Sequence, residues 1–387
     1  MIFTSTVSPS LRIGLRLLCA WPDMRYVVVR RLVFMLSMIV MQYLQYLYLF
    51  AHFKLDELQN LMDNLPTTLN YSLSAVKLMA LWTNRRIVRE ILTGMDTDWR
   101  ECVKVDEHLH LMTAKASVAH FFSNALLSFN VFAVTIYYLA IYNTAITIIQ
   151  QSQGGNDTTR PFPMKILFPF EVEQTPIYEL LFVALFVHAI FNMFTVTVVN
   201  SLIFTLVLHA GGQIDIIYQE FKAFSENVSY SGSSGHTIGI LIEKHNKVIS
   251  FSQNVGKLFS LVALTQIFFN TAIICGLGLL LMAFGKEVGA DLLKIVFAYG
   301  GIMMEVFLFC FVGEYISLKT KSLADAAYNS LWYHMTPNQS KNVLFVIMRS
   351  QKQVTFTAGG MTNLSLEVFA SIMKASASYV SVLYAMY

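Results

Sequence analysis

Side chains able to do covalent or metal chemistry occur in this sequence, but they do not gather into any chemical pattern. The four cysteines are Cys19, Cys102, Cys275 and Cys310. They share no metal-ligand spacing and imply no disulfide framework. We find no carboxylate pair, no nucleophile beside a base, no phosphate-binding glycine loop and no metal-ligand cluster. We therefore expect no enzyme activity, no cofactor and no metal. A lone histidine such as His188 is more often structural than a ligand.

The most informative spacing lies in the last apolar segment. Ala375, Ser378, Val382 and Met386 recur at intervals of three and four residues, so a helix would carry them on one face. Two interpretations stay open. Four such faces around one axis would form an ion path with an apolar constriction near Val382 and Met386, and apolar rings gate by dewetting. Alternatively, a stripe of small residues simply packs one membrane helix against another.

A second set of side chains fits the binding of a small apolar ligand. Such pockets are mostly hydrophobic and contain few polar anchors. The candidates for ligand binding are Tyr71, Ser74, Asn130, Val134, Tyr137, Tyr138, Phe182, Phe186, Tyr299 and Met303. Aromatic residues in membrane helices more often face lipid or pack against neighbours. Two interpretations therefore stay open for each of these residues, a ligand contact and a purely structural role.

The composition decides the class of protein that must position these residues. Hydrophobic residues make up 55% of the 387 residues and charged residues only 13%, about half the ~25% of a soluble domain. The net charge of +3 gives no basic footprint for nucleic acid, and the many aromatic residues exclude disorder. The composition therefore predicts an all-α, polytopic membrane protein.

Seven apolar segments are long enough to span a bilayer core of ~30 Å as helices. The predicted spans are Tyr26–Phe50, Leu65–Trp82, Val118–Gln150, Pro176–His209, Leu258–Phe284, Leu292–Val312 and Leu364–Tyr387. We expect the first to remain as a signal anchor, since it lacks a small-residue cleavage site. The pair Gly211-Gly212 is predicted to stop the fourth span.

The segment between the sixth and seventh spans mixes charged and apolar residues. It predicts helices outside lipid and divides the chain into residues 1–313, a helical anchor over 314–360 and a last helix over 361–387. Gly359-Gly360 should break the chain before that helix. Apolar side chains of the anchor suit an assembly interface, and the candidates are Trp332, Leu344, Ile347 and Met348.

The distribution of Lys and Arg sets the orientation. With the N-terminus in the cytoplasm, about twenty of these residues lie inside and about five outside. The C-terminus is then extracellular, and the sequon at Asn156 is a glycosylation candidate on an outer loop. A seven-helix G-protein-coupled receptor has the opposite orientation. A secondary transporter would show an internal repeat, which we do not find.

Ionisable residues lie inside predicted spans, among them Lys77, Glu305 and Lys374, and such groups point to a function. Glu305 either pairs with a polar neighbour or is protonated. Lys374 either lines the inner vestibule of an ion path or reaches toward the membrane surface.

The C-terminal third carries motifs in a characteristic order. They are Gly313-Glu314-Tyr315, Ala326–Tyr333, Ser350-Gln351-Lys352, Thr357–Gly360, Leu364–Phe369 and Ile372–Tyr379, preceded by His209–Gln213. This order resembles the insect odorant receptor family, and in particular its ligand-tuning subunits. The motifs match from about His209 onward, and the N-terminal half is individual.

The resemblance implies a subunit of a non-selective cation channel that a small volatile ligand opens. It implies a hetero-oligomer, tetrameric as we expect, with the shared odorant co-receptor. It also implies a place in the plasma membrane of olfactory sensory neuron dendrites and a pocket between the outer halves of the helices. The gate positions of the family fall on Val382 and Met386, and Ala385 stands where the co-receptor has a polar residue. Alternatives are a gustatory-type channel, whose closing signature is absent, and a G-protein-coupled receptor.

Overall fold

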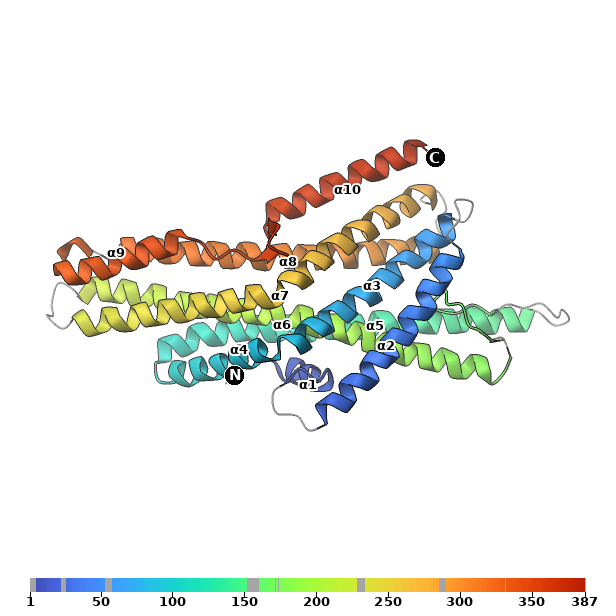
Figure 1. Cartoon of the computed structure of the whole chain (residues 1–387), viewed down its shortest axis with the longest axis horizontal. Coiled ribbons are helices and arrows are strands. Elements are labelled where there is room, and N and C mark those ends of the chain that lie inside the picture. Colours follow the sequence, from blue (N-terminus) through green and yellow to red (C-terminus); the bar gives the residue numbers. More distant parts are fainter. Residues whose placement is uncertain are drawn as a thin grey trace.

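Long helices account for most of the chain in the computed structural model, as the apolar segments predict (Figure 1). The structure describes residues 5–21, 26–52, 58–151, 160–170, 172, 174–227, 234–284, 290–330 and 332–386. Within these ranges it leaves the side chains of 58–63, 149–151, 225–227, 234–237, 279–284, 290–294 and 383–386 undescribed. The helices are α1 (Pro9–Leu17), α2 (Val27–Ala51), α3 (Leu58–Thr83), α4 (Arg85–Cys102), α5 (Asp106–Gln151), α6 (Ile177–Asn227), α7 (Ser234–Phe284), α8 (Ala290–Tyr328), η2 (Trp332–His334), α9 (Pro337–Gln351) and α10 (Leu366–Met386).

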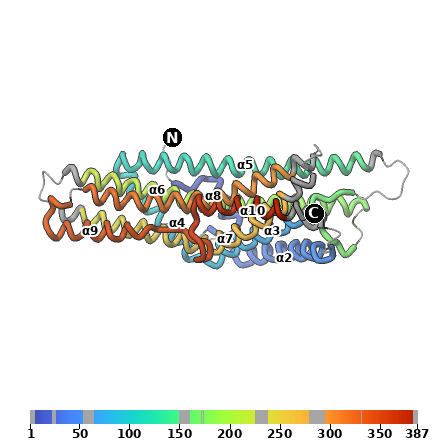
Figure 2. The backbone as a smooth tube through the Cα atoms, turned by 90° about the horizontal axis from the view of Figure 1, so that it is seen from above, coloured from blue at the N-terminus to red at the C-terminus, as the bar shows by residue number. Residues whose placement is uncertain are grey.

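The helices form an elongated bundle with two distinct ends (Figure 1). Helices α5 to α8 run along its length, and α2 and α3 cross them obliquely. We call the end that holds α4 and α9 the basal end, and the end where α10 finishes the distal end. Seen from above, α5 runs along one side of the bundle and α2 lies on the other (Figure 2).

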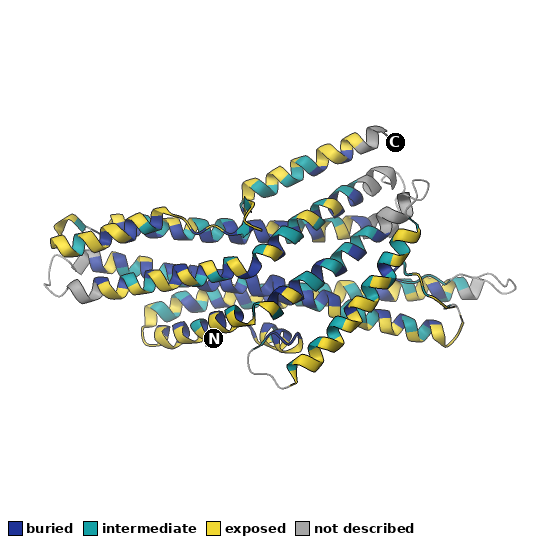
Figure 3. Ribbon diagram, viewed as in Figure 1, coloured by how far each residue is buried: buried dark blue, intermediate teal, exposed yellow. Residues whose placement is uncertain are grey.

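The apolar segments lie on helices where the sequence predicts them. Among the described residues, α2, α5, α6, α7 and α8 are long and apolar enough to cross a membrane. Side chains along α2, among them Val28, Leu32 and Leu36, are exposed in the isolated chain, as expected of a surface that faces lipid (Figure 3). The chain is therefore a helical membrane protein.

The prediction that Gly211-Gly212 ends the fourth span is wrong, because α6 continues to Asn227. A Cβ atom on Gly211 would lie 2.5 Å from Oη of Tyr315 in α8. One on Gly212 would lie 2.6 Å from Sδ of Met112 in α5. The two glycines therefore permit close approach of α5 and α8 to α6 and do not form a turn.

Helix α8 continues through residues 313 and 314 as far as Tyr328, so the predicted anchor begins inside a helix and shares it with the sixth span. After η2, helix α9 starts with a capping box, in which Thr336 and Gln339 pair their side chains with each other's backbone. Its apolar face packs back on the bundle through Val343 and Val346.

A small hairpin joins α9 to α10. Strands β1 (Thr357–Ala358) and β2 (Thr362–Asn363) pair antiparallel. The turn is the predicted break at Gly359 and Gly360, whose φ angles of +59° and +73° favour glycine. The N–H of Gly359 donates to the carbonyl oxygen of Ser260 in α7 at 2.9 Å. The start of α10 is thus attached to α7.

We predict that Gly211→Val destabilises the protein by about 1–3 kcal/mol, since its side chain would overlap the Tyr315 ring. Gly94→Ala is the matched control, because a Cβ atom there meets nothing within 4 Å, and it should be neutral or stabilising. Thermal unfolding of the purified variants measures both. Equal melting temperatures for the two variants would contradict the packing role of Gly211.

Candidate functional site

Aromatic side chains from α3, α5 and α6 meet near the distal end. The buried members of this aromatic cluster are Tyr71, Tyr138, Ala145, Met164, Tyr178, Phe182 and Leu185. Met41, Val134, Tyr137, Ile141, Phe162, Ile166, Phe186 and Ala189 pack around them. The Tyr138 ring lies edge-on to Phe182 at 5.6 Å and to Phe186 at 5.1 Å between centroids, an arrangement that aromatic quadrupoles favour.

Six of the ten predicted ligand-binding residues belong to this cluster, namely Tyr71, Val134, Tyr137, Tyr138, Phe182 and Phe186. Sequence spacing within single helices cannot show such convergence, which arises because α5 and α6 pack side by side with α3 against α6. Walls of this kind suit a small apolar molecule.

The other predicted ligand residues have different surroundings. The Ser74 hydroxyl donates to the Asn192 side chain, and the Asn130 amide donates to the Thr197 hydroxyl at 3.0 Å. Both contacts join neighbouring helices to α6. Tyr299 and Met303 lie in a separate apolar cluster between α7, α8 and α10. The structure therefore does not bring these two residues to the aromatic cluster.

A charged network crosses the centre of the bundle. Lys77 in α3 is completely buried, and its Nζ lies 3.7 Å from Oε1 of Glu305 in α8. Asn200 in α6 bridges the pair, because its Oδ1 accepts from Lys77 at 3.1 Å and its Nδ2 donates to Glu305 at 3.0 Å. From α7, the amides of Gln266 and Asn270 donate to the other carboxylate oxygen. Of the two possibilities for Glu305, the structure thus shows the paired one.

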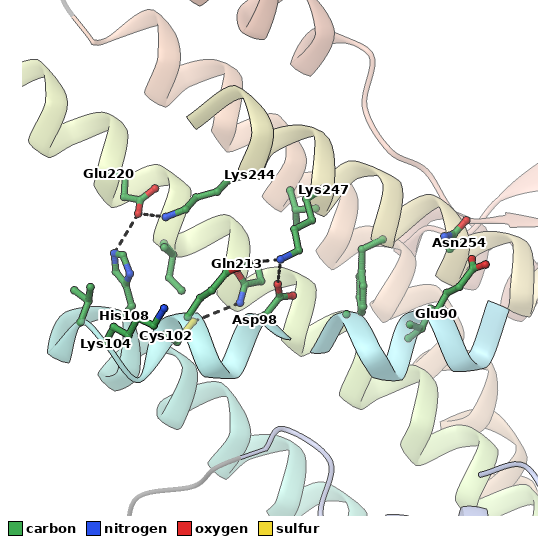
Figure 4. Close-up of a pocket in the computed structure, with 17 residues that line it drawn as sticks. Glu90, Asp98, Cys102, Lys104, His108, Gln213, Glu220, Lys244, Lys247 and Asn254 are labelled. Carbon is green, nitrogen blue, oxygen red and sulfur yellow. Dashed lines mark hydrogen bonds and ion pairs between the residues drawn. The ribbon is translucent and has the colours of Figure 1, made fainter. Parts of the chain in front are cut away.

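A cavity of about 370 Å³ lies at the basal end between α4, α5, α6 and α7 (Figure 4). Ion pairs line its walls: Lys247 pairs with Asp98 at 2.6 Å, and Glu220 pairs with Lys244. Nε2 of His108 lies 3.5 Å from the same Glu220 carboxylate, and burial lowers the pKa of this histidine. Apolar side chains such as Ile216 and Phe251 also line the cavity. An apolar ligand would nevertheless strip water from the charged groups there without replacing their hydration. These pairs join α4 and α6 to α7.

Asp98 also belongs to a buried hydrogen-bond chain. His209 lies 3.0 Å from Oδ2 of Asp98 through Nε2 and 3.0 Å from the Thr6 hydroxyl through Nδ1. Burial raises the pKa of the Asp98 carboxyl, but His209 and Lys247 outweigh burial and leave that pKa below its usual value. The order hydroxyl, imidazole, carboxylate is that of a hydrolytic triad. Thr6 and His209 are both 0% exposed, so no substrate reaches them. These hydrogen bonds instead attach the N-terminal segment to α4 and α6.

Helix α10 diverges from the bundle toward the distal end (Figure 1). One face, with Ser376 and Val380, is buried, and Val380 contacts α7 at Gly278. On the other face Val382 is 57% exposed and Ser378 is exposed, while Ala375 is half-buried. Ala385 and Met386 lie within α10, but their side chains are outside the described residues, as is the whole of Asn156. Lys374 is exposed.

The predicted assembly residues do not form one surface. Ile347 is buried with Val343 in the core of the chain, whereas Leu344 and Met348 are exposed together with Phe345. Trp332 packs partly buried against the main core. The exposed apolar surface of α9 is therefore Leu344, Phe345 and Met348.

Comparison with known proteins gives one consistent result. The family model "7tm Odorant receptor" matches residues 57–377. The chain belongs to this odorant receptor family. It is 20% identical to odorant receptor 13a of Drosophila melanogaster over 348 residues, which cover 84% of this chain and 80% of that protein. It is 21% identical to odorant receptor 10 of Aedes albopictus over 327 residues, which cover 82% of each.

The fold agrees with that of a solved odorant receptor. The structure of the insect olfactory receptor OR5 from Machilis hrabei in complex with eugenol has a TM-score of 0.78, 14% identity and 98% coverage of both chains. The resemblance predicted from the C-terminal motifs is therefore confirmed: the chain is an insect odorant receptor and not an enzyme. The family match ends at residue 377, before the predicted gate positions.

The central network was only partly visible in the odorant receptor sequence. Glu305 stands out as an ionisable residue in a predicted span, but its partners lie on three other helices and were not identified. The available signal was that Lys77, Asn200 and Gln266 each interrupt an apolar segment, where polar groups pair with one another.

We predict that Lys77→Met destabilises the receptor by about 3–5 kcal/mol, because it leaves Glu305 unpaired. The double variant Lys77→Met/Glu305→Gln should lose less than the sum of the two single changes, since no unpaired charge remains. Thermal unfolding of purified receptor measures this coupling. Lys374→Met is the control, as Lys374 is exposed. Equal losses for Lys77→Met and Lys374→Met would disprove the role of the pair.

Proposed function

We propose that this odorant receptor is the ligand-tuning subunit of a non-selective cation channel. A small volatile ligand opens the channel, which assembles with the odorant co-receptor as a hetero-oligomer, most simply a tetramer, in the plasma membrane of sensory dendrites. The observation that carries the proposal is the free face of α10. Ser378 and Val382 are exposed in the isolated chain on the face of α10 that carries the predicted stripe, and a shared ion path would cover them.

In this proposal α3 and α10 also cross the membrane, which gives seven spans. The basal end, where α4 and α9 lie, is cytoplasmic, and the C-terminus is extracellular. Support comes from the distribution of Lys and Arg, which concentrates on the segments of the basal end. There the exposed surface of Leu344, Phe345 and Met348 on α9 offers an assembly interface.

The aromatic cluster is the proposed ligand site. Its walls are apolar, it lies in the distal half, and it contains six of the ten residues predicted from sequence. The Machilis hrabei receptor was solved in complex with eugenol, and a small organic ligand of similar kind fits walls of Tyr, Phe and Met. The charged basal cavity does not offer such walls.

Ligand binding opens the proposed gate only through a higher affinity for the open state. Helices α7 and α8 are placed to transmit the change, because both contact α10. Val380 packs on Gly278 of α7, and Phe369 packs near Phe307 of α8 with ring centroids 5.6 Å apart. Movement of the distal ends of α7 and α8 would carry α10 away from the axis and widen the constriction at Val382 and Met386.

We predict that Val382→Cys makes the channel sensitive to a charged, membrane-impermeant thiol reagent, because this position would face the water of the ion path. Current recordings from the chain co-expressed with the co-receptor measure the effect. Val380→Cys is the matched control two residues away, buried against α7. If neither cysteine responds while odorant-evoked current is intact, α10 does not line the path.

We predict that Phe182→Ala raises the half-maximal odorant concentration at least tenfold, since a buried wall of the aromatic cluster is removed. Phe268→Ala is the control, because Phe268 is 70% exposed on α7. Concentration–response curves for an odorant panel measure the effect, and surface labelling checks that both variants reach the membrane. Unchanged curves for Phe182→Ala would place the ligand site elsewhere.

A further inference from the structure

Three buried polar atoms near the aromatic cluster have no hydrogen-bond partner among the described residues. They are Oη of Tyr71 in α3, Oε1 of Gln45 in α2 and Nδ1 of His188 in α6. Tyr71 is 4% exposed and Gln45 is 0% exposed. In the hydrocarbon core of a membrane an unpaired polar group is costly, so such groups are rare unless something else satisfies them.

The three atoms belong to one neighbourhood. The rings of Tyr71 and His188 stack with centroids 5.3 Å apart and planes inclined by 10°. The Gln45 amide nitrogen lies 3.5 Å from Sδ of Met164, and Met164 and Tyr71 are both buried members of the aromatic cluster. The unpaired atoms therefore surround the same cluster from three helices.

The other buried tyrosines of the cluster show that Tyr71 is an exception. The Tyr138 hydroxyl donates to the carbonyl oxygen of Leu185 at 3.0 Å, and the Tyr178 hydroxyl donates to that of Pro161 at 2.8 Å. Both are paired within the chain. Tyr71 alone among these three has a hydroxyl with no hydrogen-bond partner among the described residues.

The chemistry of the unpaired atoms identifies a kind of ligand. Nδ1 of His188 has no partner, and on a neutral imidazole whose proton is on Nε2 this nitrogen is an acceptor. Gln45 offers a second acceptor, and the Tyr71 hydroxyl can donate. A ligand ether or ketone can only accept, so it would satisfy Tyr71 and leave both acceptors unpaired. A ligand hydroxyl accepts from Tyr71 and donates its own proton as well.

We propose that Tyr71 and His188 make this receptor selective for small volatile alcohols or phenols. The Tyr71 hydroxyl donates to the ligand oxygen, and Nδ1 of His188 accepts the ligand proton. This inference rests on the proposed ligand site in the aromatic cluster and adds a polar specificity to its apolar walls.

The test compares ligands of nearly equal size that differ in one group. Two sets of probes serve: benzyl alcohol, anisole and ethylbenzene, and 1-hexanol, methyl pentyl ether and heptane. Currents are recorded from the chain co-expressed with the co-receptor. In the unaltered receptor the alcohol of the responding set should act at about tenfold lower concentration than its ether and its hydrocarbon. His188→Phe, which keeps a ring beside Tyr71, should abolish the difference between alcohol and ether, because only the alcohol donates to Nδ1. Tyr71→Phe should weaken alcohol and ether alike toward the hydrocarbon, because both accept from its hydroxyl, and should leave the hydrocarbon response unchanged.

Tyr138→Phe and Tyr178→Phe are the matched controls, because each removes a hydroxyl that is already paired. They should preserve the order of the three probes. Equal potency of alcohol and ether in the unaltered receptor, or a preference for alcohol over ether that survives His188→Phe, would overturn the inference and leave the apolar ligand site intact. A different result would contradict the proposed ligand site itself: the Phe182→Ala receptor would respond to every probe as strongly as the unaltered receptor does.

A second measurement needs neither ligand nor current. Without odorant, Tyr71→Phe should melt at the same temperature as the unaltered receptor or higher, since it removes an unpaired buried hydroxyl. Tyr138→Phe should melt lower, since it leaves the Leu185 carbonyl without its donor. A loss on Tyr71→Phe as large as that on Tyr138→Phe would show that the Tyr71 hydroxyl is already paired, and would overturn the inference.

Discussion

The ion pair between Lys77 and Glu305 is the contact on which the centre of the bundle depends. In lipid, apolar side chains gain little by leaving the solvent, so helix association depends on close packing and on polar groups that need partners. A lysine at the centre of α3 and a glutamate in α8 have no stable position except beside each other. Asn200 and Gln266 complete the network from α6 and α7. Four helices are therefore held in one relative arrangement, and the surrounding apolar residues pack to fit it.

On either side of this central network, the two ends of the bundle are held together by different kinds of contact. Toward the distal end, α3, α5 and α6 present aromatic rings to one another, and contacts between apolar rings predominate there. Toward the basal end, pairs such as Lys247–Asp98 join the helices, and the hairpin fixes the start of α10 on α7. The start of α10 is thus attached by hydrogen bonds, whereas Val380, further along the helix, rests on α7 through apolar contact alone.

Periodicity and composition predict the helices of this odorant receptor well, since an apolar run of twenty residues has few alternatives to a membrane helix. Periodicity and composition do not decide between two roles that the same residue type can fill, such as a turn glycine and a glycine at a close helix contact. The pair Gly211-Gly212 predicted a turn, but in α6 these glycines lie against Tyr315 and Met112. The same limit applies to the site: Phe182 and Tyr138 converge as predicted, whereas Tyr299 has similar chemistry and lies in another cluster. Which helices become neighbours is set by buried partners such as Lys77, and one helix at a time does not reveal them.

Glu305 places the central network close to the surface that α10 contacts. One turn further along α8, Phe309 faces Lys77 with its ring centroid 5.9 Å from Nζ, and the next residue, Cys310, packs in the cluster that holds Phe369 and Met373 of α10. The pair that fixes α3 thus adjoins the surface on which α10 rests. On α3, Tyr71 precedes Lys77 by less than two helical turns. In the gating we propose, a ligand that displaced Tyr71 would act on a helix whose buried charge is tied to α8. A shift of α3 would then strain either the ion pair or the contact surface of α10. Breaking a buried ion pair is strongly unfavourable, so in the gating we propose this strain would be relieved at α10.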